Sequence, residues 1–310
     1  MSDLVEVVGL GPILKSAGIE IAEPDLEAIY QDLSESPNHL VTITEIESRI
    51  RTYFESIEIP ENATFYDYML LSLREKDLVA TFNWDPLLLQ AYRRNAAVRR
   101  LPRVHFLHGN VSIGVCLDCR VVGPANCACE NCGHELQPSR LLYPVQDKDY
   151  VSDPFIEGEW HALRRNLRQA YIVTIVGYSA PSADAAAVEL MQEVWDQNQT
   201  RELAQIEIVN TQSKDELFET WEPFIVREHY HITDTIHRTL QARWPRRSCD
   251  AFASATLLLS PWPINQLPEF RDLFQLQSWI QPLLQEEIAL EEDGVPLSGK
   301  TTEEIQGGAT

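Results

Sequence analysis

The segment FLHGNVSIGVCLDCRVVGPANCACENCG, residues 106–133, holds two pairs of cysteines, and the members of each pair are separated by two residues. The pairs are Cys116 with Cys119 and Cys129 with Cys132. Thiolates at this spacing turn back onto one ion, and two such turns supply a closed tetrahedral site for Zn²⁺. Five of the six cysteines fall within 17 residues, which favours metal ligands over scattered thiols or a disulfide. Because closed four-thiolate sites are usually structural, we expect a zinc ribbon, about residues 114–136, that holds other elements in place.

Two neighbouring side chains offer alternative ligands within the ribbon. Cys127 would give the second pair a different spacing, and His134 follows the last cysteine closely. Asn131 and Gly133 suit a tight turn that points backbone amides at sulfur, as in a zinc knuckle. The two CxxC pairs are therefore the predicted ligands, with Cys127 and His134 as the competing choices.

The composition describes an ordinary globular protein. With 310 residues and 44% hydrophobic content, the chain can bury a full core, so we expect one sizeable domain with appendages. Residues 1–18 lack a secretion signal, and no apolar run approaches the roughly 20 residues that span a bilayer, so we expect a cytoplasmic protein with no membrane partner. The net charge of −22 argues against nucleic acid as a general partner. Basic stretches at residues 93–100 and 164–165 are anion contacts or solvated helix faces.

The periodicity of apolar residues predicts an α/β fold. Thr44 with Glu47 and Thr64 with Asp67 have the spacing of capping boxes, so the first third should be mainly helical. Short apolar runs then alternate with helical stretches, which predicts a Rossmann-like parallel sheet with helices on both faces. The runs are residues 78–82, 104–107, 171–176 and 206–209, and the helical stretches are residues 160–169 and 184–196.

Small and polar residues follow each predicted strand. In parallel sheets, ligands lie beyond the carboxyl ends of the strands, so these residues are where chemistry is expected. They are Asn83-Trp84-Asp85, His108-Gly109-Asn110, Gly177-Tyr178-Ser179 and Asn210-Thr211. Any one of them is ordinary loop chemistry, but four in succession favour a binding site.

The carboxyl-terminal part has a different character. We expect the sheet domain to span residues 1–245 and a helical extension to span residues 246–285. The extension, which includes Trp262, should pack against the domain or against a partner, such as another copy of the chain. Residues 286–310 are acidic and lack apolar periodicity, which predicts a disordered tail.

In order along the chain, the motifs are Thr81-Phe82-Asn83-Trp84-Asp85, Leu107-His108-Gly109, the two CxxC pairs, Gly177-Tyr178-Ser179 and Asn210. With this order and the intervening ribbon, residues 77–211 resemble the sirtuin-like family of NAD-consuming proteins. The resemblance is closer to bacterial sirtuin-like NAD hydrolases than to protein deacylases. Phe82 stands where deacylases prefer Gln, and residues 141–144 lack the Phe-Gly-Glu strand with which deacylases hold a peptide.

The resemblance implies an NAD glycohydrolase, which cleaves the bond between nicotinamide and ribose, as defence-associated members of the family do when they deplete NAD. It places Asn83 near the nicotinamide ribose, Asp85 at the carboxamide, and His108 as the general base. It also implies structural Zn²⁺ and cofactor-binding positions at Thr81, Gly177, Ser179 and Asn210.

The chemistry of the bond agrees with these residue types. Cleavage develops oxocarbenium character on the ribose, and nearby carboxamide and imidazole groups can orient hydroxyls or water and accept a proton. Histidine titrates in the useful pH range, and glycine allows close approach of the backbone to the dinucleotide. A buried, neutral His108 with no cavity beside it would contradict the catalytic role.

The amino terminus departs from the family's pattern. Val5–Val8 followed by Gly9-Leu10-Gly11 could form a strand and a phosphate-binding loop, but Pro12 removes an amide that a phosphate would use. We instead expect Pro12 to open a helix, Ile13 to Ala17, which Gly18 ends. In that case the chain starts inside the fold or has lost the loop. The alternative function is then a catalytically degenerate module that binds NAD or a partner.

A serine hydrolase is the third hypothesis. Ser179 lies between a predicted strand and a predicted helix like a nucleophile elbow, with three histidines downstream, His229, His231 and His237. Pro181 occupies the position of the elbow's second glycine, and a zinc ribbon has no role in such enzymes. Both observations count against this hypothesis.

Overall fold

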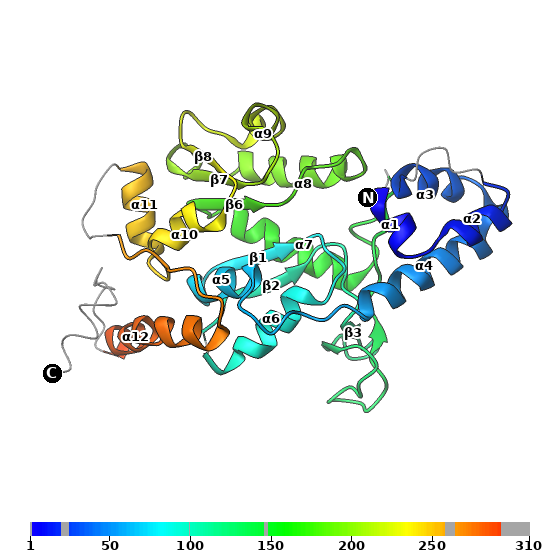
Figure 1. The fold of residues 1–310 in the computed structure, drawn as a ribbon, viewed down its shortest axis with the longest axis horizontal. Helices are drawn as coiled ribbons and strands as arrows, with labels where there is room; N and C mark the ends of the chain where they lie inside the picture. Colours follow the sequence, from blue (N-terminus) through cyan, green and yellow to red (C-terminus); the bar gives the residue numbers. More distant parts are fainter. Residues whose placement is uncertain (1, 20–24, 99, 146–147, 258–263, 293–310) are drawn as a thin grey trace.

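Parallel strands form the centre of the protein, and helices cover them (Figure 1). The structure is a computed structural model that describes residues 2–19, 25–98, 100–145, 148–257 and 264–292. Its parallel strands are β1 (Leu78–Thr81), β2 (Arg103–Phe106), β6 (Ile172–Val176), β7 (Gln205–Val209) and β8 (Tyr230–Thr233). The α/β class with parallel strands is confirmed.

The single sheet that was predicted is divided into two hydrogen-bonded groups. β1 pairs with β2, and β6, β7 and β8 pair in that order. Within the described parts of the chain, no strand ladder joins the two groups. β7 is buried along its whole length, whereas β6 is only half-buried, as expected of a strand with one unpaired edge. Apolar runs identify strands but do not encode which edges pair, and this is why the division was not predicted.

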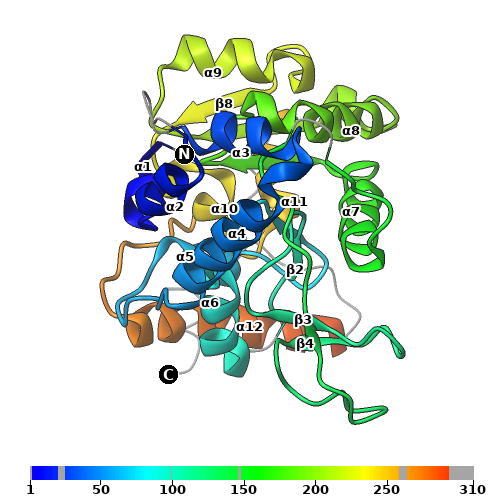
Figure 2. The same cartoon turned by 90° about the vertical axis from the view of Figure 1, so that its right-hand side faces the viewer.

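Helices lie on both sides of β1 and β2. Figures 1 and 2 place α5 (Phe65–Ser72) and α6 (Leu87–Asn95) on one side and α7 (Pro154–Leu167) on the other. The Asp153 carboxylate caps α7 by accepting hydrogen bonds from the amides of the first turn. Trp160 of α7 donates its indole N–H to the carbonyl of Leu107, 3.0 Å away, which ties the helix to the end of β2.

The helices of the half that contains β6, β7 and β8 lie between these strands or follow β8. They are α8 (Ala185–Asp196), α9 (Lys214–Trp221), α10 (Leu240–Arg243) and α11 (Ser248–Thr256). Short 3₁₀ turns connect the elements of the chain: η1 (Pro37–His39), η2 (Ala96–Val98), η3 (Ser182–Asp184), η4 (Arg201–Leu203), η5 (Glu222–Phe224) and η6 (Ile236–Arg238). Trp160, Trp195 and Trp221 are all buried in the main core. No described helix is both long and apolar enough to cross a bilayer.

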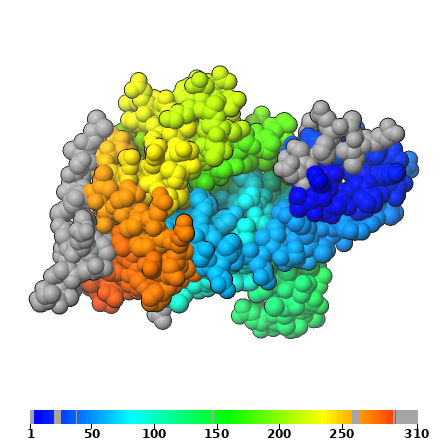
Figure 3. All heavy atoms as spheres, viewed as in Figure 1, coloured from blue at the N-terminus to red at the C-terminus, as the bar shows by residue number. Residues whose placement is uncertain are grey.

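The amino-terminal helices build a second, smaller core. They are α1 (Ser2–Val7), α2 (Gly11–Ser16), α3 (Leu26–Ser34) and α4 (Leu40–Glu55), and they form a lobe beside the strands (Figure 3). This core also includes three residues from outside the amino-terminal helices, which are Trp84, Val111 and Leu141. The lobe is therefore fixed to the segments that follow β1 and β2.

The helical interpretation of the amino terminus is confirmed. Residues 5–7 belong to α1 and not to a strand, Pro12 lies in the first turn of α2, and Gly18 follows the helix with φ +76°. The alternative, a strand followed by a phosphate loop, was therefore wrong. Thr44 also differs from prediction: it lies inside α4, and its hydroxyl donates to the carbonyl of Leu40, 2.9 Å away. The capping box at Thr64 and Asp67 is confirmed.

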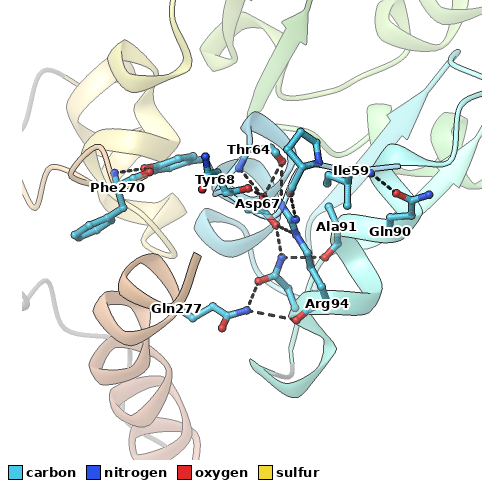
Figure 4. A network of polar contacts seen from close by, with 12 residues as sticks. Ile59, Thr64, Asp67, Tyr68, Gln90, Ala91, Arg94, Phe270 and Gln277 are labelled. Atoms are coloured by element: carbon cyan, nitrogen blue, oxygen red, sulfur yellow. Dashed lines mark hydrogen bonds and ion pairs between the residues drawn. The ribbon is translucent and has the colours of Figure 1, made fainter. Parts of the chain in front are cut away.

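A buried polar network fastens the carboxyl-terminal helix to the body (Figure 4). Asp67 is fully buried and accepts hydrogen bonds from the Thr64 amide at 2.7 Å, Arg94 Nε at 2.8 Å and Asn95 Nδ2 at 2.7 Å. Gln277 of α12 (Leu273–Glu292) donates to Asn95 Oδ1 at 2.8 Å. The carboxyl-terminal extension thus packs against its own domain.

The acidic tail was predicted to begin too early. α12 continues to Glu292, and Glu287 is only 1% exposed. Both carboxylate oxygens of Glu287 accept hydrogen bonds from Arg246, at 2.7 and 2.8 Å. Trp262 and the rest of the predicted tail, residues 293–310, lie outside the described residues.

Candidate functional site

The four predicted cysteines converge at the tip of a small antiparallel sheet. The sheet consists of β3 (Ile113–Val115), β4 (Val122–Pro124) and β5 (Gln137–Pro138), and its segment projects from the body (Figure 3). The four sulfur atoms lie within 4.8 Å of one another, and the sulfurs of Cys116 and Cys132 are 3.5 Å apart. Four thiols at these distances can close around one Zn²⁺ ion.

Each cysteine pair is shaped by the same backbone turn. The amide of Gly133 donates to the carbonyl of Cys129, and the amide of Arg120 donates to the carbonyl of Cys116, both at 2.8 Å. Both donors have left-handed backbone conformations, with φ +75° at Gly133 and +56° at Arg120. Glycine signals such a turn in a sequence, whereas arginine does not, so only the second turn was predicted.

The second turn also favours a thiolate. Hydrogen bonds from the backbone amides of Cys132 and Asn131 lower the pKa of the Cys129 thiol to about 7. A thiolate is the form that binds metal. The direction of this pKa shift agrees with the prediction that the turn aims amides at sulfur.

The competing ligands lie outside the group of four sulfurs. Cys127 is exposed and does not join it. His134 is exposed, and its Nδ1 lies 2.9 Å from a carboxylate oxygen of Asp118. Asp118, His134 and Cys132 form a second, overlapping group that shares one cysteine with the first. The structure therefore favours the four predicted cysteines as one site.

The ends of β1, β2 and β6 meet around one aromatic side chain. The Phe82 ring lies edge-on to the His108 ring with centroids 4.8 Å apart, and it stacks on the Tyr178 ring at 4.3 Å. Phe82 follows β1, His108 lies beyond β2, and Tyr178 lies beyond β6. Residues from both groups of strands are thus brought to one place, even though no ladder joins the groups.

Asn83 and Asp85 lie in the turn that follows β1. The Thr81 hydroxyl oxygen accepts a hydrogen bond from the Asn83 amide at 3.0 Å, so Thr81 shapes the turn. Burial raises the pKa of the Asp85 carboxyl, while hydrogen bonds from the Leu87 amide and the Asn83 side chain oppose that rise. Thr81, Asn83 and Asp85 thus belong to one turn at the carboxyl end of β1.

His108 is buried and neutral. The residue is 5% exposed, and burial lowers the pKa of its imidazole to about 4. Among the described residues, Nε2 has no hydrogen-bond partner, and its nearest carboxylate oxygen, on Asp184, is 3.9 Å away. The structure thus holds His108 as a buried, neutral imidazole, which counts against its predicted catalytic role as long as no cavity opens beside it.

A buried polar cluster surrounds Asp184 beside His108. Lys148 Nζ donates to Asp184 Oδ1 at 2.8 Å and also to the carbonyl of Ala183. The Tyr178 hydroxyl donates to Asp184 Oδ2 at 3.1 Å. Sequence reasoning missed Lys148 and Asp184, because neither belongs to a recognised motif and they are 36 residues apart.

Two predicted cofactor-binding residues line a cavity of about 590 Å³ at the carboxyl ends of β6, β7 and β8. They are Gly177 and Asn210, and the lining also includes Tyr68 of α5 and His237 of η6. Gly177 has φ +63°, and an added Cβ would meet no atom within 4 Å, so its backbone is open to the cavity. Thr81, Ser179 and His108 do not line this cavity.

The arrangement required of a serine hydrolase is not present among the described residues. Ser179 makes no hydrogen bond to a histidine there. Nδ1 of His229 and Nδ1 of His237 lack partners, and His231 Nδ1 lies 3.6 Å from Glu207. That chemistry needs a nucleophile hydrogen-bonded to a base and the base hydrogen-bonded to an acid, and in the described part of the chain no histidine is bonded to Ser179.

Comparison with known proteins gives matches only among solved structures, since neither a family model nor a curated protein matches the sequence. The chain is similar to a Sir2 homologue in complex with NAD, with 14% identity, a TM-score of 0.36, and coverage of 71% of this chain and 79% of that one. It is also similar to Sir2 with a p53 peptide and NAD⁺, with 14% identity, a TM-score of 0.35, and coverage of 75% and 91%. At these identities and TM-scores, the matches do not decide the family of this chain.

Proposed function

We propose that this protein is a sirtuin-like NAD-consuming enzyme that cleaves the N-glycosidic bond between nicotinamide and ribose. The observation that carries the proposal is the cavity of about 590 Å³ at the carboxyl ends of β6, β7 and β8, lined by Gly177 and Asn210. Its position is where parallel α/β sheets bind ligands, and its size suits part of a dinucleotide. Depletion of NAD in defence is the biological use that the resemblance suggests.

The catalytic step is assigned to residues beyond β1 and β2. Asp85 and Asn83, in the turn after β1, would orient the nicotinamide carboxamide and the adjoining ribose. As the bond breaks, positive charge develops on the ribose, and the Asp85 carboxylate would stabilise it. The free Nε2 of His108 would accept a proton from a ribose hydroxyl or from water.

Asp184 affects the basicity of His108. Its carboxylate, 3.9 Å from His108 Nε2, favours the protonated imidazole and raises the histidine's pKa, whereas Lys148 lowers it. Because Lys148 already pairs with Asp184, burial dominates and His108 stays neutral. For proton transfer at neutral pH, the bound substrate would have to displace the rings that bury His108.

The four clustered cysteines would hold Zn²⁺ in a structural role. The ion would cross-link the two turns and leave no open position for chemistry. The ribbon begins directly after the turn that carries His108 and Asn110, so the ion would stabilise the segment on which the proposed base stands.

A second candidate is a module that binds NAD or a related molecule without cleaving it. The burial of His108, together with a helix in place of a phosphate loop at Gly11–Ser16, favours this candidate. Both candidates use the cavity at Gly177 and Asn210. They differ in whether His108 becomes accessible when the ligand binds.

The test is nicotinamide release from NAD by the zinc-loaded full chain, with binding of NAD measured by calorimetry on the same sample. The informative variant is His108→Ala, and the matched control is His161→Ala, an exposed histidine on α7. Release by the wild type and the control, lost in an equally folded His108→Ala, supports the enzyme. Binding without release, weakened by Asn210→Ala, supports the module. If NAD neither binds nor is cleaved, both candidates are wrong.

A further inference from the structure

Three further metal-ligating side chains gather at the tip of the ribbon, beside the cluster of four cysteines. The atoms are a carboxylate oxygen of Asp118, the sulfur of Cys132 and Nδ1 of His134, and they lie within 4.8 Å of one another. Carboxylate, thiolate and imidazole are all ligands that Zn²⁺ accepts. Asp118 lies between the cysteines of the first pair, and His134 follows the second pair. The folding that assembles the four cysteines therefore also assembles this second group.

Cys132 is the residue that the two groups share, and its exposure suits a thiolate that binds two ions. The other three cysteines of the cluster are buried or half-buried, whereas Cys132 is exposed. The side chains of Asp118 and His134 are 69% and 72% exposed. A thiolate sulfur has more than one lone pair, so it can bind an ion on each side. Cys132 is therefore the member of the cluster that a second ion can reach from the solvent.

The spacing of the nitrogen and oxygen atoms is close to the spacing that a zinc ion imposes. His134 Nδ1 lies 2.9 Å from the carboxylate oxygen of Asp118. Two such ligands of one tetrahedral Zn²⁺, each about 2.0–2.2 Å from the ion, lie about 3.3–3.6 Å apart. The pair would therefore have to open by only about 0.5 Å, which exposed side chains achieve by small rotations.

The backbone that carries His134 is held by hydrogen bonds. The amide of Cys129 donates to the carbonyl of His134 at 2.7 Å. Next to this contact, Ala128 and Glu135 form an antiparallel bridge. The position of the histidine relative to the second cysteine pair is therefore fixed before any metal binds, and a metal site needs such preorganised ligands.

The charge of the ribbon favours a second cation. Four thiolates and one Zn²⁺ leave an excess of two negative charges in the first cluster. The ribbon adds three acids, Asp118, Glu130 and Glu135, against one cation, Arg120. A divalent ion bound between Asp118 and Cys132 would reduce the repulsion among these groups.

We propose that Asp118, Cys132 and His134 bind a second Zn²⁺ ion, with Cys132 as a thiolate shared by both ions. Three protein ligands leave one position of a tetrahedral ion open, where water or a donor group of another molecule would bind. The thiolate and the imidazole favour Zn²⁺ over the hard cations Mg²⁺ and Ca²⁺. With fewer protein ligands and full exposure, the second ion should exchange more readily than the first.

The inference does not rest on the proposed function. The second group lies on the ribbon that projects from the body (Figure 3), whereas the proposed NAD chemistry lies at the ends of the parallel strands. Loss of the second ion should therefore leave NAD binding unchanged, and a failure of either proposal would not affect the other.

The test measures zinc stoichiometry on the full chain in two steps. Dialysis of the zinc-loaded protein against zinc-free buffer should leave one ion per chain, measured by atomic absorption, in the cluster of four cysteines. Titration of the dialysed protein with Zn²⁺, followed by calorimetry, should then show one further ion. The informative variants are Asp118→Asn and His134→Ala. The matched control is Glu130→Gln, an exposed acid of the ribbon that lies outside both groups.

We expect each informative variant to keep the first ion and to bind the added Zn²⁺ at least about tenfold more weakly, because it loses one of three ligands. Glu130→Gln should bind as the wild type does. Absence of a second ion in the wild type overturns the proposal. So does loss of the first ion in His134→Ala, which would make the histidine a ligand of the first site. Equal weakening by Glu130→Gln would show general charge attraction and also overturn it.

Co²⁺ tests whether Cys132 is shared. Thiolate-bound Co²⁺ has an intense charge-transfer absorption in the near ultraviolet, which carboxylate and imidazole ligands alone do not give. Co²⁺ added to the dialysed protein should produce this absorption while the zinc content of the same sample stays constant. Bound Co²⁺ without the absorption would remove Cys132 from the second site. Absorption that appears only as zinc is released would show exchange at the first site, and either result overturns the proposal.

Discussion

Gly109 should be one of the least replaceable residues of the chain, because it forms the turn that presents His108. It has φ +80°, and its amide donates to the carbonyl of Phe106 at 3.1 Å. A Cβ at this position would lie 2.0 Å from the carbonyl oxygen of Arg140 and 3.0 Å from its carbonyl carbon. The obstacle is backbone, so it cannot rotate away as a side chain would.

The cost of Gly109→Ala has two parts. A left-handed conformation costs a residue with a Cβ about 1–2 kcal/mol. The overlap must be relieved by a shift of two backbone segments, and overpacking of this kind costs about 1–3 kcal/mol. We therefore expect Gly109→Ala to lower the free energy of unfolding by about 2–5 kcal/mol.

Gly9→Ala is the matched control. Gly9 has φ +71°, and a Cβ there would meet nothing within 4 Å, so only the conformational part of the cost applies. Urea unfolding of both zinc-loaded variants, followed by tryptophan fluorescence, should show the larger loss for Gly109→Ala. If the two variants lose the same stability, the close approach to Arg140 does not exist in the folded protein, and the position of His108 described above is incorrect.

Three further predictions concern the metal, one buried histidine and one buried ion pair. Cys116→Ser should lose zinc, measured by atomic absorption, whereas Cys127→Ser should keep one ion per chain, because Cys127 lies outside the cluster. His108 has a folded pKa of about 4, below its ordinary value of 6.5, so the unfolded chain binds more protons between these values and stability falls as pH drops through that window. His108→Asn should remove about 3 kcal/mol of this pH dependence, as measured by urea unfolding at pH 7 and pH 4. Glu287→Gln should cost about 3–5 kcal/mol in the same assay, because it leaves Arg246 buried and unpaired, whereas Glu45→Gln in an exposed pair should cost less than about 1 kcal/mol.

The predicted strands agree with the structure because their signal is local. Each of the four apolar runs begins and ends within one residue of an observed strand. β8 was missed, since Tyr230–Thr233 alternates its apolar residues with a polar histidine and a polar threonine. A search for continuous apolar runs overlooks a strand in which polar and apolar residues alternate.

The errors share a different physical cause, which is contact between distant parts of the chain. Residues 286–292 look like a solvated acidic tail until Arg246 is known to pair with Glu287 across 41 positions. The division between β1 and β6 likewise depends on which edges meet in space. Neither the pairing of Arg246 with Glu287 nor the pairing of strand edges can be predicted from composition.

In the candidate site, too, the part that local spacing determines was predicted and the part that depends on distant contacts was not. Two CxxC pairs impose their geometry through short turns, so the cysteine cluster was predictable from spacing alone. The surroundings of His108 were not, because they come from three separate segments, which carry Phe82, Lys148 with Tyr150, and Asp184. Motif spacing predicts which residues reach a strand end, while their protonation depends on what packs around them.

The two candidate functions therefore differ by one conformational step and not by residue content. In the structure described here, Phe82 stacks on Tyr178, Tyr178 donates to Asp184, and Asp184 is held by Lys148. These contacts surround His108, and the stack of Phe82 on Tyr178 joins the two groups of strands. A ligand whose flat ring replaced Tyr178 against Phe82 would free Asp184 from one donor, raise the pKa of His108 and open its Nε2 to the substrate. In an enzyme, the stack of Tyr178 on Phe82 must be weaker than the stack of nicotinamide on Phe82. In a binding module, the stack of Tyr178 on Phe82 must be the stronger of the two.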